Sequence, residues 1–185
     1  MKDDILIGDT PKAIRRRQRY ADVKSSGRIW KHSGLADIEG LVTRQNIEDC
    51  FVLTMVRNPW DRVVSYYHWL REQKFEHYSV SAAKRMTFSE FIFDDAIFDS
   101  LKNHPYESYV TDARGTEQCD LFVRLEHVAD DLVPFEKHLG IVLSPLQRIN
   151  KSQRKEDYRA YYGDDDAKRV LDMCKRDIER FDYTF

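Results

Sequence analysis

The pattern of apolar and polar residues predicts short strands separated by helices. Residues Phe51 to Val56 form an apolar run rich in β-branched side chains, which is typical of a buried strand. We expect strands at 51–57 and 118–125, and helices at 10–20, 35–46, 59–74, 127–139 and about 165–181. Because helices lie between the strands, this order favours an α/β fold with a parallel sheet and right-handed crossovers.

Residues at the ends of several segments agree with these boundaries. Asn58 is a good N-cap, and Pro59 fits the first helical position, where a missing N–H is no loss. Gly140 is placed to end a helix in the left-handed conformation. Ser33 is the expected cap of the helix at 35–46.

Apolar residues at helical spacing give three predicted helices a buried face. These positions are Leu35, Ile38, Leu41 and Val42 in the first, Trp60, Val63, Val64, Tyr67 and Leu70 in the second, and Ala167, Val170, Leu171, Cys174, Ile178 and Phe181 in the last. Residues 75–117 lack such a period, so we expect an irregular stretch there. It should contain one short helix, opened by a capping box between Thr87 and Glu90.

The corner between the strand and the helix at 59–74 carries candidate chemistry. Arg57 follows the strand directly, and Ser65 lies about 9 Å along the helix from Pro59. An Arg fork and a Ser hydroxyl suit a phosphate that lies over the start of the helix. On residue types alone a plainer interpretation is favoured, in which the Arg caps a sheet edge and the Ser lies on a solvated face.

Three blocks of sequence bear on this choice. They are VRNPWDRVVSYYHWL from Val56, LFVRLEHVADDLVPFEKHLGI at 121–141 and RINKSQRKEDYRAYYGDDDAKRVLDMCKRDIERFDYTF at 148–185. In this order they resemble sulfotransferases that use 3′-phosphoadenosine 5′-phosphosulfate (PAPS). The resemblance is closest to the carbohydrate-type enzymes, including bacterial relatives of heparan sulfate 2-O-sulfotransferase.

The resemblance implies a fold, a reaction and a set of site residues. It implies one domain over 1–185 with the three-layer parallel sheet of the P-loop nucleoside triphosphate hydrolase-like sulfotransferases. PAPS would be the sulfuryl donor and a hydroxyl, expected on a saccharide, the acceptor, without a metal. Arg57 and Ser65 match the positions that hold the 3′-phosphate of the donor. Lys151 and Ser152, in a polar turn of the third block, are candidates for further phosphate contacts or an ordinary exposed turn.

One part of the family pattern is missing before Phe51. The resembling enzymes hold the phosphosulfate in a Lys-containing, Gly/Thr-rich loop at a helix N-terminus. The chain has seven glycines, four of them before Phe51, and nothing like this loop follows Lys12. We therefore expect an N-terminally incomplete domain, lacking on the order of 30 residues or more. A start assigned too late, a trimmed N-terminus and a natural remnant are all compatible with this expectation.

A catalytic base should accept the proton of the attacking hydroxyl. The segment GRIWKHSGLADI resembles the region in which the carbohydrate enzymes carry a catalytic His, which makes His32 the candidate. The alternative is that His32 lies beside a helix cap with no chemistry. His68 is expected to lie on the surface or to line the acceptor site, and Arg124 and Glu126 to form an internal ion pair.

Composition narrows the partners. The net charge of −2 gives no reason to expect nucleic acid, although the run Arg15, Arg16, Arg17 and Arg19 is locally basic. No apolar stretch reaches the length of a membrane span, and the three scattered cysteines suit a reducing, cytoplasmic setting. A sheet that lacks its central strand would expose apolar surface and favour a homodimer.

Two hypotheses of different class follow from the sequence. The first is a PAPS-dependent sulfotransferase with a saccharide acceptor. The second is a non-catalytic remnant of that family, which binds a nucleotide or a partner but has lost transfer. A nucleotide kinase is disfavoured because no Ser or Thr follows a loop Lys to hold Mg²⁺.

Overall fold

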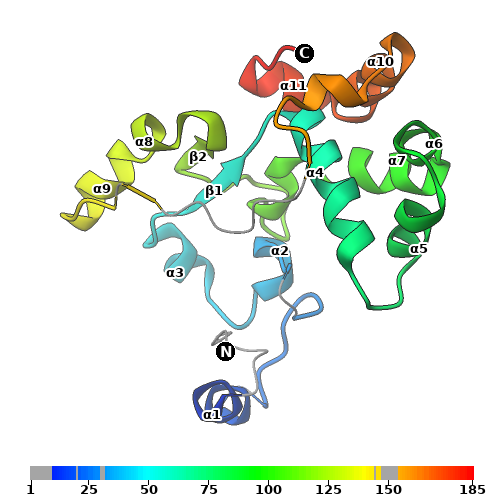
Figure 1. Ribbon diagram of the computed structural model, residues 1–185. Coiled ribbons are helices and arrows are strands. Elements are labelled where there is room, and N and C mark those ends of the chain that lie inside the picture. The colour runs from blue at the N-terminus through cyan, green and yellow to red at the C-terminus, as the bar shows by residue number, and fades with distance from the viewer. Residues whose placement is uncertain (1–9, 20, 30–31, 144, 147–153) are drawn as a thin grey trace. The chain divides into compact units, whose positions relative to one another are not determined.

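The computed structural model describes residues 10–19, 21–29, 32–143, 145–146 and 154–185 (Figure 1). This part of the chain is mixed α/β, mostly helical, with one small parallel sheet in which β1 pairs with β2. The elements are α1 (Pro11–Arg19), α2 (Leu35–Ile38), α3 (Arg44–Glu48), β1 (Leu53–Val56), α4 (Pro59–Glu72), α5 (Tyr78–Arg85), α6 (Phe88–Phe93), α7 (Asp95–Lys102), η1 (Tyr106–Tyr109), β2 (Leu121–Arg124), η2 (Leu125–His127), α8 (Val128–Asp131), α9 (Val133–Leu139), η3 (Tyr158–Tyr161), α10 (Asp164–Met173) and α11 (Lys175–Phe181). The α/β class is confirmed, and the three-layer sheet stays a prediction.

The chain divides into two compact units. The first unit comprises 1–55, 106–123 and 132–140, and the second comprises 56–105, 124–131 and 141–185. The chain passes from the first unit to the second at the ends of both strands.

In the first unit, the helix predicted at 35–46 is wrong, because two short helices, α2 and α3, replace it. Gly40 separates them with a φ of 97°, and a Cβ at this position would collide with the Lys24 carbonyl oxygen. This conformation is open to glycine but strained for other residues. A helix predicted from apolar spacing alone is therefore interrupted where the backbone turns.

The caps of these two helices also differ from the prediction. Gly34, rather than Ser33, is the N-cap of α2, and the Ser33 hydroxyl donates to the Arg28 carbonyl oxygen at 3.0 Å. Thr43 opens α3, where its hydroxyl accepts from the Asn46 N–H at 3.1 Å. A new cap at Thr43 marks the start of the second helix.

The two strands belong mainly to the first unit and are shorter than predicted. Asp120 joins their beginnings, since its carboxylate accepts from the Val52 N–H at 2.7 Å and its own N–H donates to the Val52 carbonyl oxygen at 2.8 Å. Phe51 packs against α9, with its ring centroid 5.2 Å from that of Phe135 and 4.8 Å from that of His138. The predictions of strands at 51–57 and 118–125 are confirmed at their centres.

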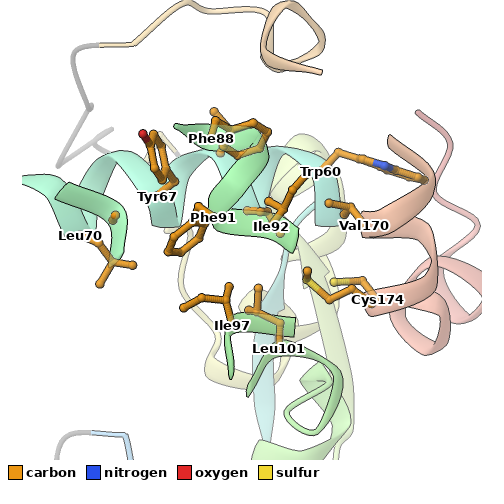
Figure 2. Packing of buried hydrophobic residues seen from close by; sticks show 14 of the residues in the cluster. Trp60, Tyr67, Leu70, Phe88, Phe91, Ile92, Ile97, Leu101, Val170 and Cys174 are labelled. Atoms are coloured by element: carbon orange, nitrogen blue, oxygen red, sulfur yellow. The ribbon is translucent and has the colours of Figure 1, made fainter. Parts of the chain in front are cut away.

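The second unit is built around α4. Its predicted apolar stripe is buried, and Figure 2 shows Trp60, Tyr67 and Leu70 within the core cluster. The residues that pack with the stripe come from α5, α6, α7, α10 and α11 and from the break between the last two, and they include Val80, Ala83, Phe88, Phe91, Ile92, Ile97, Leu101, Val170, Met173, Cys174 and Ile178. Burial of each large side chain contributes about 1.5–3 kcal/mol, so this cluster fixes the position of α4.

The prediction of an irregular stretch at 75–117 is wrong over its first part. Residues 78–102 form α5, α6 and α7, which supply much of the core of the second unit. The capping box between Thr87 and Glu90 is confirmed, with the Thr87 N–H donating to Glu90 Oε2 at 2.8 Å. Asp94 ends α6 and also caps α7, so these helices are short and follow one another directly. Neither is long enough to show the repeated apolar spacing by which a helix is recognised in a sequence.

Two other predicted helices are interrupted in the structure. The segment predicted at 127–139 forms η2, α8 and α9, with Pro134 near the start of α9 removing one backbone donor. Gly140 ends α9 with a φ of 69°, as predicted. The last helix breaks at Cys174 into α10 and α11.

The three cysteines are all free, but their surroundings differ. Cys174 is buried in the core, Cys119 is half-buried and Cys50 is exposed. Burial raises the pKa of the Cys174 thiol to about 12, so the thiol stays protonated. A role as a small buried hydrophobe therefore fits Cys174 alone.

Candidate functional site

The predicted corner forms at the end of β1 and is held by backbone and side-chain hydrogen bonds within the second unit. Asn58 Oδ1 accepts from the Trp60 N–H at 3.0 Å, which confirms the N-cap. Asn58 Nδ2 donates to the Tyr158 hydroxyl at 3.2 Å and to the Thr184 carbonyl oxygen at 3.0 Å. The cap thus ties the start of α4 to the C-terminal part of the chain.

Arg57 lies at this corner and binds a carboxylate one turn into the helix. Its Nε donates to Asp61 Oδ2 at 2.6 Å, and its Nη2 contacts the same oxygen. Arg154, 93 residues further along the chain, donates from Nη2 to Asp61 Oδ1 at 2.5 Å. Two guanidinium groups therefore share one carboxylate, and we call Arg57, Asp61 and Arg154 the shared-carboxylate cluster.

The cluster is largely removed from water. The side chain of Arg154 is 8% exposed, that of Asp61 17% and that of Arg57 23%. Within these three side chains, two positive charges face one negative charge. The positive end of the dipole of this 14-residue helix adds to the positive charge of the cluster. The cluster is therefore suited to binding an anion.

One donor of this cluster has no partner. Arg154 Nη1 is closed off from solvent and makes no hydrogen bond to any residue within the described ranges. A buried donor left unpaired costs about 1–3 kcal/mol, and more when it is charged. An oxyanion bound to Nη1 would recover this free energy.

Ser65 lies on α4, one turn beyond Asp61, and is partly buried. Asp61, Ser65 and His68 follow one another at spacings of four and three, so they lie along one side of the helix. Of the predicted phosphate ligands, Arg57 therefore lies just before α4, and Ser65 lies in the second turn of this helix. Asp61 lies between them in sequence and occupies the Arg57 fork.

His68 is more enclosed than the sequence suggested. Its Nε2 is closed off from solvent and has no hydrogen-bond partner in the part of the chain that the structure describes. The ring packs edge-on against those of Tyr161 and Tyr67, at centroid distances of 5.0 and 5.4 Å. Burial lowers the pKa of His68, and the charges of Arg71 and Arg154 lower it further, while Glu72 opposes them. The imidazole is therefore neutral at pH 7.

The other predicted site residues are His32, Lys151 and Ser152. His32 belongs to the first unit, two residues before the Gly34 cap of α2, and is exposed. Lys151 and Ser152 lie outside the described residues. The structure thus provides a setting for Arg57 and Ser65, and the roles of the other three stay predictions.

The tyrosines of the third block support the corner. Tyr162 donates its hydroxyl proton to the Trp60 carbonyl oxygen at 2.7 Å, and burial raises its pKa. The Phe185 ring packs against the rings of Trp60, Tyr158 and Tyr162 at 5.6, 6.1 and 5.4 Å. These rings form part of the packing that holds the helix start in place.

The ion pair predicted between Arg124 and Glu126 is wrong in its partner. Arg124 forms a two-pronged pair with Asp131, from Nε to Oδ2 and from Nη2 to Oδ1, both at 2.9 Å. Glu126 accepts from the Asn58 N–H at 2.7 Å and from the Tyr183 hydroxyl at 3.1 Å. Glu126 therefore holds the backbone of the corner and places a second carboxylate near it.

Sequence reasoning missed Arg154 altogether. Arg154 lies in the charged segment RKED at 154–157, and nothing in the neighbouring residues indicates that its side chain contacts α4. Its position 93 residues from Asp61 depends on how the third block packs. The only available signal was an Arg within the third resembling block.

The described residues contain no group of three or more His, Cys, Asp or Glu side chains that could hold a metal ion. Within the same ranges, no helix combines the length and the apolar character required to cross a membrane.

Comparison with known proteins adds no relative to this picture. No family model matches the chain, and neither a characterised protein nor a solved structure does.

Proposed function

We propose that this chain is a sulfotransferase that moves the sulfuryl group of PAPS to a hydroxyl of a saccharide. The observation that carries the proposal is the shared-carboxylate cluster at the start of α4. It provides a surplus positive charge and an unpaired buried donor, Arg154 Nη1, where the resemblance expects a 3′-phosphate. Arg57, Arg154 and Ser65 would bind that phosphate, with Lys151 and Ser152 as additional ligands.

The transfer itself requires a base and a leaving group. The acceptor oxygen attacks sulfur, the bond from sulfur to the bridging oxygen of the 5′-phosphate breaks, and adenosine 3′,5′-bisphosphate (3′,5′-ADP) leaves. His32 would take the hydroxyl proton, a role that rests on the resemblance of its segment. The proposal includes a three-layer parallel sheet, a cytoplasmic location and a possible homodimer.

A second candidate function is a binding module that recognises the nucleotide or a partner without transferring sulfate. The same observation supports it, because the shared-carboxylate cluster would bind a phosphate whether or not transfer follows. The cluster at α4 would then bind the 3′-phosphate end of a ligand on which this chain performs no chemistry.

Calorimetric titration with 3′,5′-ADP and with 5′-AMP tests whether the 3′-phosphate is recognised. We expect 3′,5′-ADP to bind more tightly than 5′-AMP. Arg57→Ala should lower the ratio of the two affinities by about tenfold or more, since a charged hydrogen bond contributes about 1.5–3 kcal/mol. Arg85→Ala, which removes an exposed Arg on α5, is the matched control.

The outcomes separate the two candidates. If the unmodified chain does not bind 3′,5′-ADP, it is neither a PAPS-dependent sulfotransferase nor a module that binds this nucleotide. Binding that requires Arg57, together with release of 3′,5′-ADP from PAPS in the presence of an oligosaccharide, supports the transferase. Binding without transfer to any saccharide supports the binding module.

A further inference from the structure

Two buried polar atoms lack partners in the described part of the second unit, and they belong to one cluster of side chains. They are His68 Nε2 and Arg154 Nη1. The Lys155 N–H, next to Arg154, donates to the Tyr161 hydroxyl at 2.8 Å, and the Tyr161 ring packs on His68 at 5.0 Å. Arg154 then reaches Asp61, which lies on the same side of α4 as His68.

We propose that His68 is a proton-linked ligand of the anion that binds the shared-carboxylate cluster. In this arrangement the His68 imidazolium donates from Nε2 to an oxygen of a phosphate monoester, while Arg154 Nη1 donates to the same group. The inference rests on the proposed function, in which the anion is the 3′-phosphate of PAPS. It adds a dependence on proton binding that Arg57 and Ser65 alone do not provide.

The charged groups around His68 determine the sign of this effect. In the free protein Arg71 and Arg154 repel an imidazolium and Glu72 attracts it, while the packed rings of Tyr67 and Tyr161 exclude water. Burial and the two guanidinium groups thus hold the pKa of His68 below its usual value. A bound phosphate dianion adds two negative charges and reverses the balance, so the pKa of His68 rises and binding takes up a proton.

Both atoms are closed off from solvent in the structure. An anion therefore reaches them only if the groups that cover them move aside. Asp61 competes for the same guanidinium groups, and Glu126 holds a further negative charge at the Asn58 N–H. A dianion supplies more charge than either carboxylate, and this favours a phosphate monoester over a singly charged ligand.

The experiment measures how many protons bind together with the ligand. Titrations with 3′,5′-ADP and with inorganic phosphate, in two buffers of different ionisation enthalpy, give the proton uptake at pH 7. We expect His68→Asn to take up fewer protons than the unmodified chain, by up to about one. We also expect its affinity at pH 6.5 to be about tenfold weaker and the deficit to shrink towards pH 8.

A matched variant separates this effect from a loss of structure. His127→Asn removes an exposed histidine of the same unit and should leave the proton uptake unchanged. Thermal unfolding checks that both variants are folded. A purely structural role for His68 would lower stability or affinity equally at all pH values and would not alter the number of protons.

The outcomes for the two ligands distinguish the inference from the proposed function. If 3′,5′-ADP binds and His68→Asn takes up as many protons as the unmodified chain, the inference is wrong and the function stands. If phosphate binds with a proton uptake that depends on His68 while 3′,5′-ADP does not bind, the inference stands and the function is wrong. If neither ligand binds, both are wrong.

Discussion

Two of the arginine–aspartate sites in the second unit differ in their balance of charge. Arg124 and Asp131 form a one-to-one pair with two parallel hydrogen bonds, and the Arg side chain is 42% exposed. In the shared-carboxylate cluster, two guanidinium groups meet one carboxylate, and the Arg154 side chain is 8% exposed. The first site pairs one charge with one opposite charge, whereas the second has two guanidinium groups for one carboxylate, and its Arg154 Nη1 has no hydrogen-bond partner among the described residues.

This difference separates a structural ion pair from a site that can bind a ligand. A balanced, solvated pair has little to gain from a further anion, because water and the partner already satisfy its groups. A buried surplus charge is costly in the free protein and becomes favourable when an anion neutralises it. Burial of an Arg therefore indicates a binding site only when its carboxylate partners are too few.

The largest expected effect comes from removing the shared carboxylate. Asp61→Asn preserves the shape of the side chain but removes the negative charge that the two guanidinium groups share. We expect it to lower the free energy of unfolding by about 3 kcal/mol, as for a broken buried ion pair. Asp131→Asn, the matched change at the site whose Arg is exposed to water, should cost about 1 kcal/mol. Urea unfolding at pH 7 in phosphate-free buffer measures both.

Added phosphate sharpens this comparison. An anion that replaces the lost carboxylate stabilises the folded state by mass action. Phosphate should therefore restore part of the unfolding free energy that Asp61→Asn loses and none of that which Asp131→Asn loses. If the two variants lose equal free energies of unfolding and respond equally to phosphate, the two sites do not differ in their balance of charge.

The second prediction removes the surplus charge. Arg154→Met keeps a long side chain and leaves Asp61 paired one-to-one with Arg57. We expect the affinity for 3′,5′-ADP to fall by roughly 10–100-fold, since a charged hydrogen bond and one counter-charge are lost together. Calorimetry measures the affinity, and Arg124→Met is the control that should leave it unchanged. An unaltered affinity in Arg154→Met would exclude this residue from the site.

Much of the cluster's setting could be predicted because it depends on neighbouring residues. The Asn58 cap, the Pro59 position and the stripe from Trp60 to Leu70 are properties of one strand-to-helix segment, and all three are confirmed. The same holds for the capping box at Thr87. Local hydrogen bonds and helical periodicity are sufficient to determine these features.

The features that sequence reasoning missed depend on distant contacts or on short elements. Arg154 meets Asp61 across 93 residues, and Glu126 reaches the Asn58 N–H across 68. Helices α5 to α7 have eight, six and eight residues, too few for a clear period. The break at Gly40 follows from a backbone conformation that apolar spacing does not report.

The smallest expected effect is the pH dependence of the balanced pair. The hydrogen bonds from Arg124 lower the pKa of Asp131 to about 2. Since the pKa in the folded state lies below the unfolded value of about 3.9, the pair stabilises the protein above pH 4, and the contribution is lost as the pH falls towards 2. The difference in unfolding free energy between the unmodified chain and Asp131→Asn should be about 1 kcal/mol or less at pH 6 and should narrow below pH 4.

Denaturant unfolding of both proteins, at steps of pH down to the limit at which they stay folded, follows this difference. Asp131 is the only titrating group that distinguishes the two chains, so the narrowing reports its carboxyl alone. A difference that stays constant from pH 6 to pH 3 would mean that the Arg124 pair does not hold the carboxylate in its ionised form. The exposed site would then contribute through packing, and the contrast with the buried cluster would rest on burial rather than on charge balance.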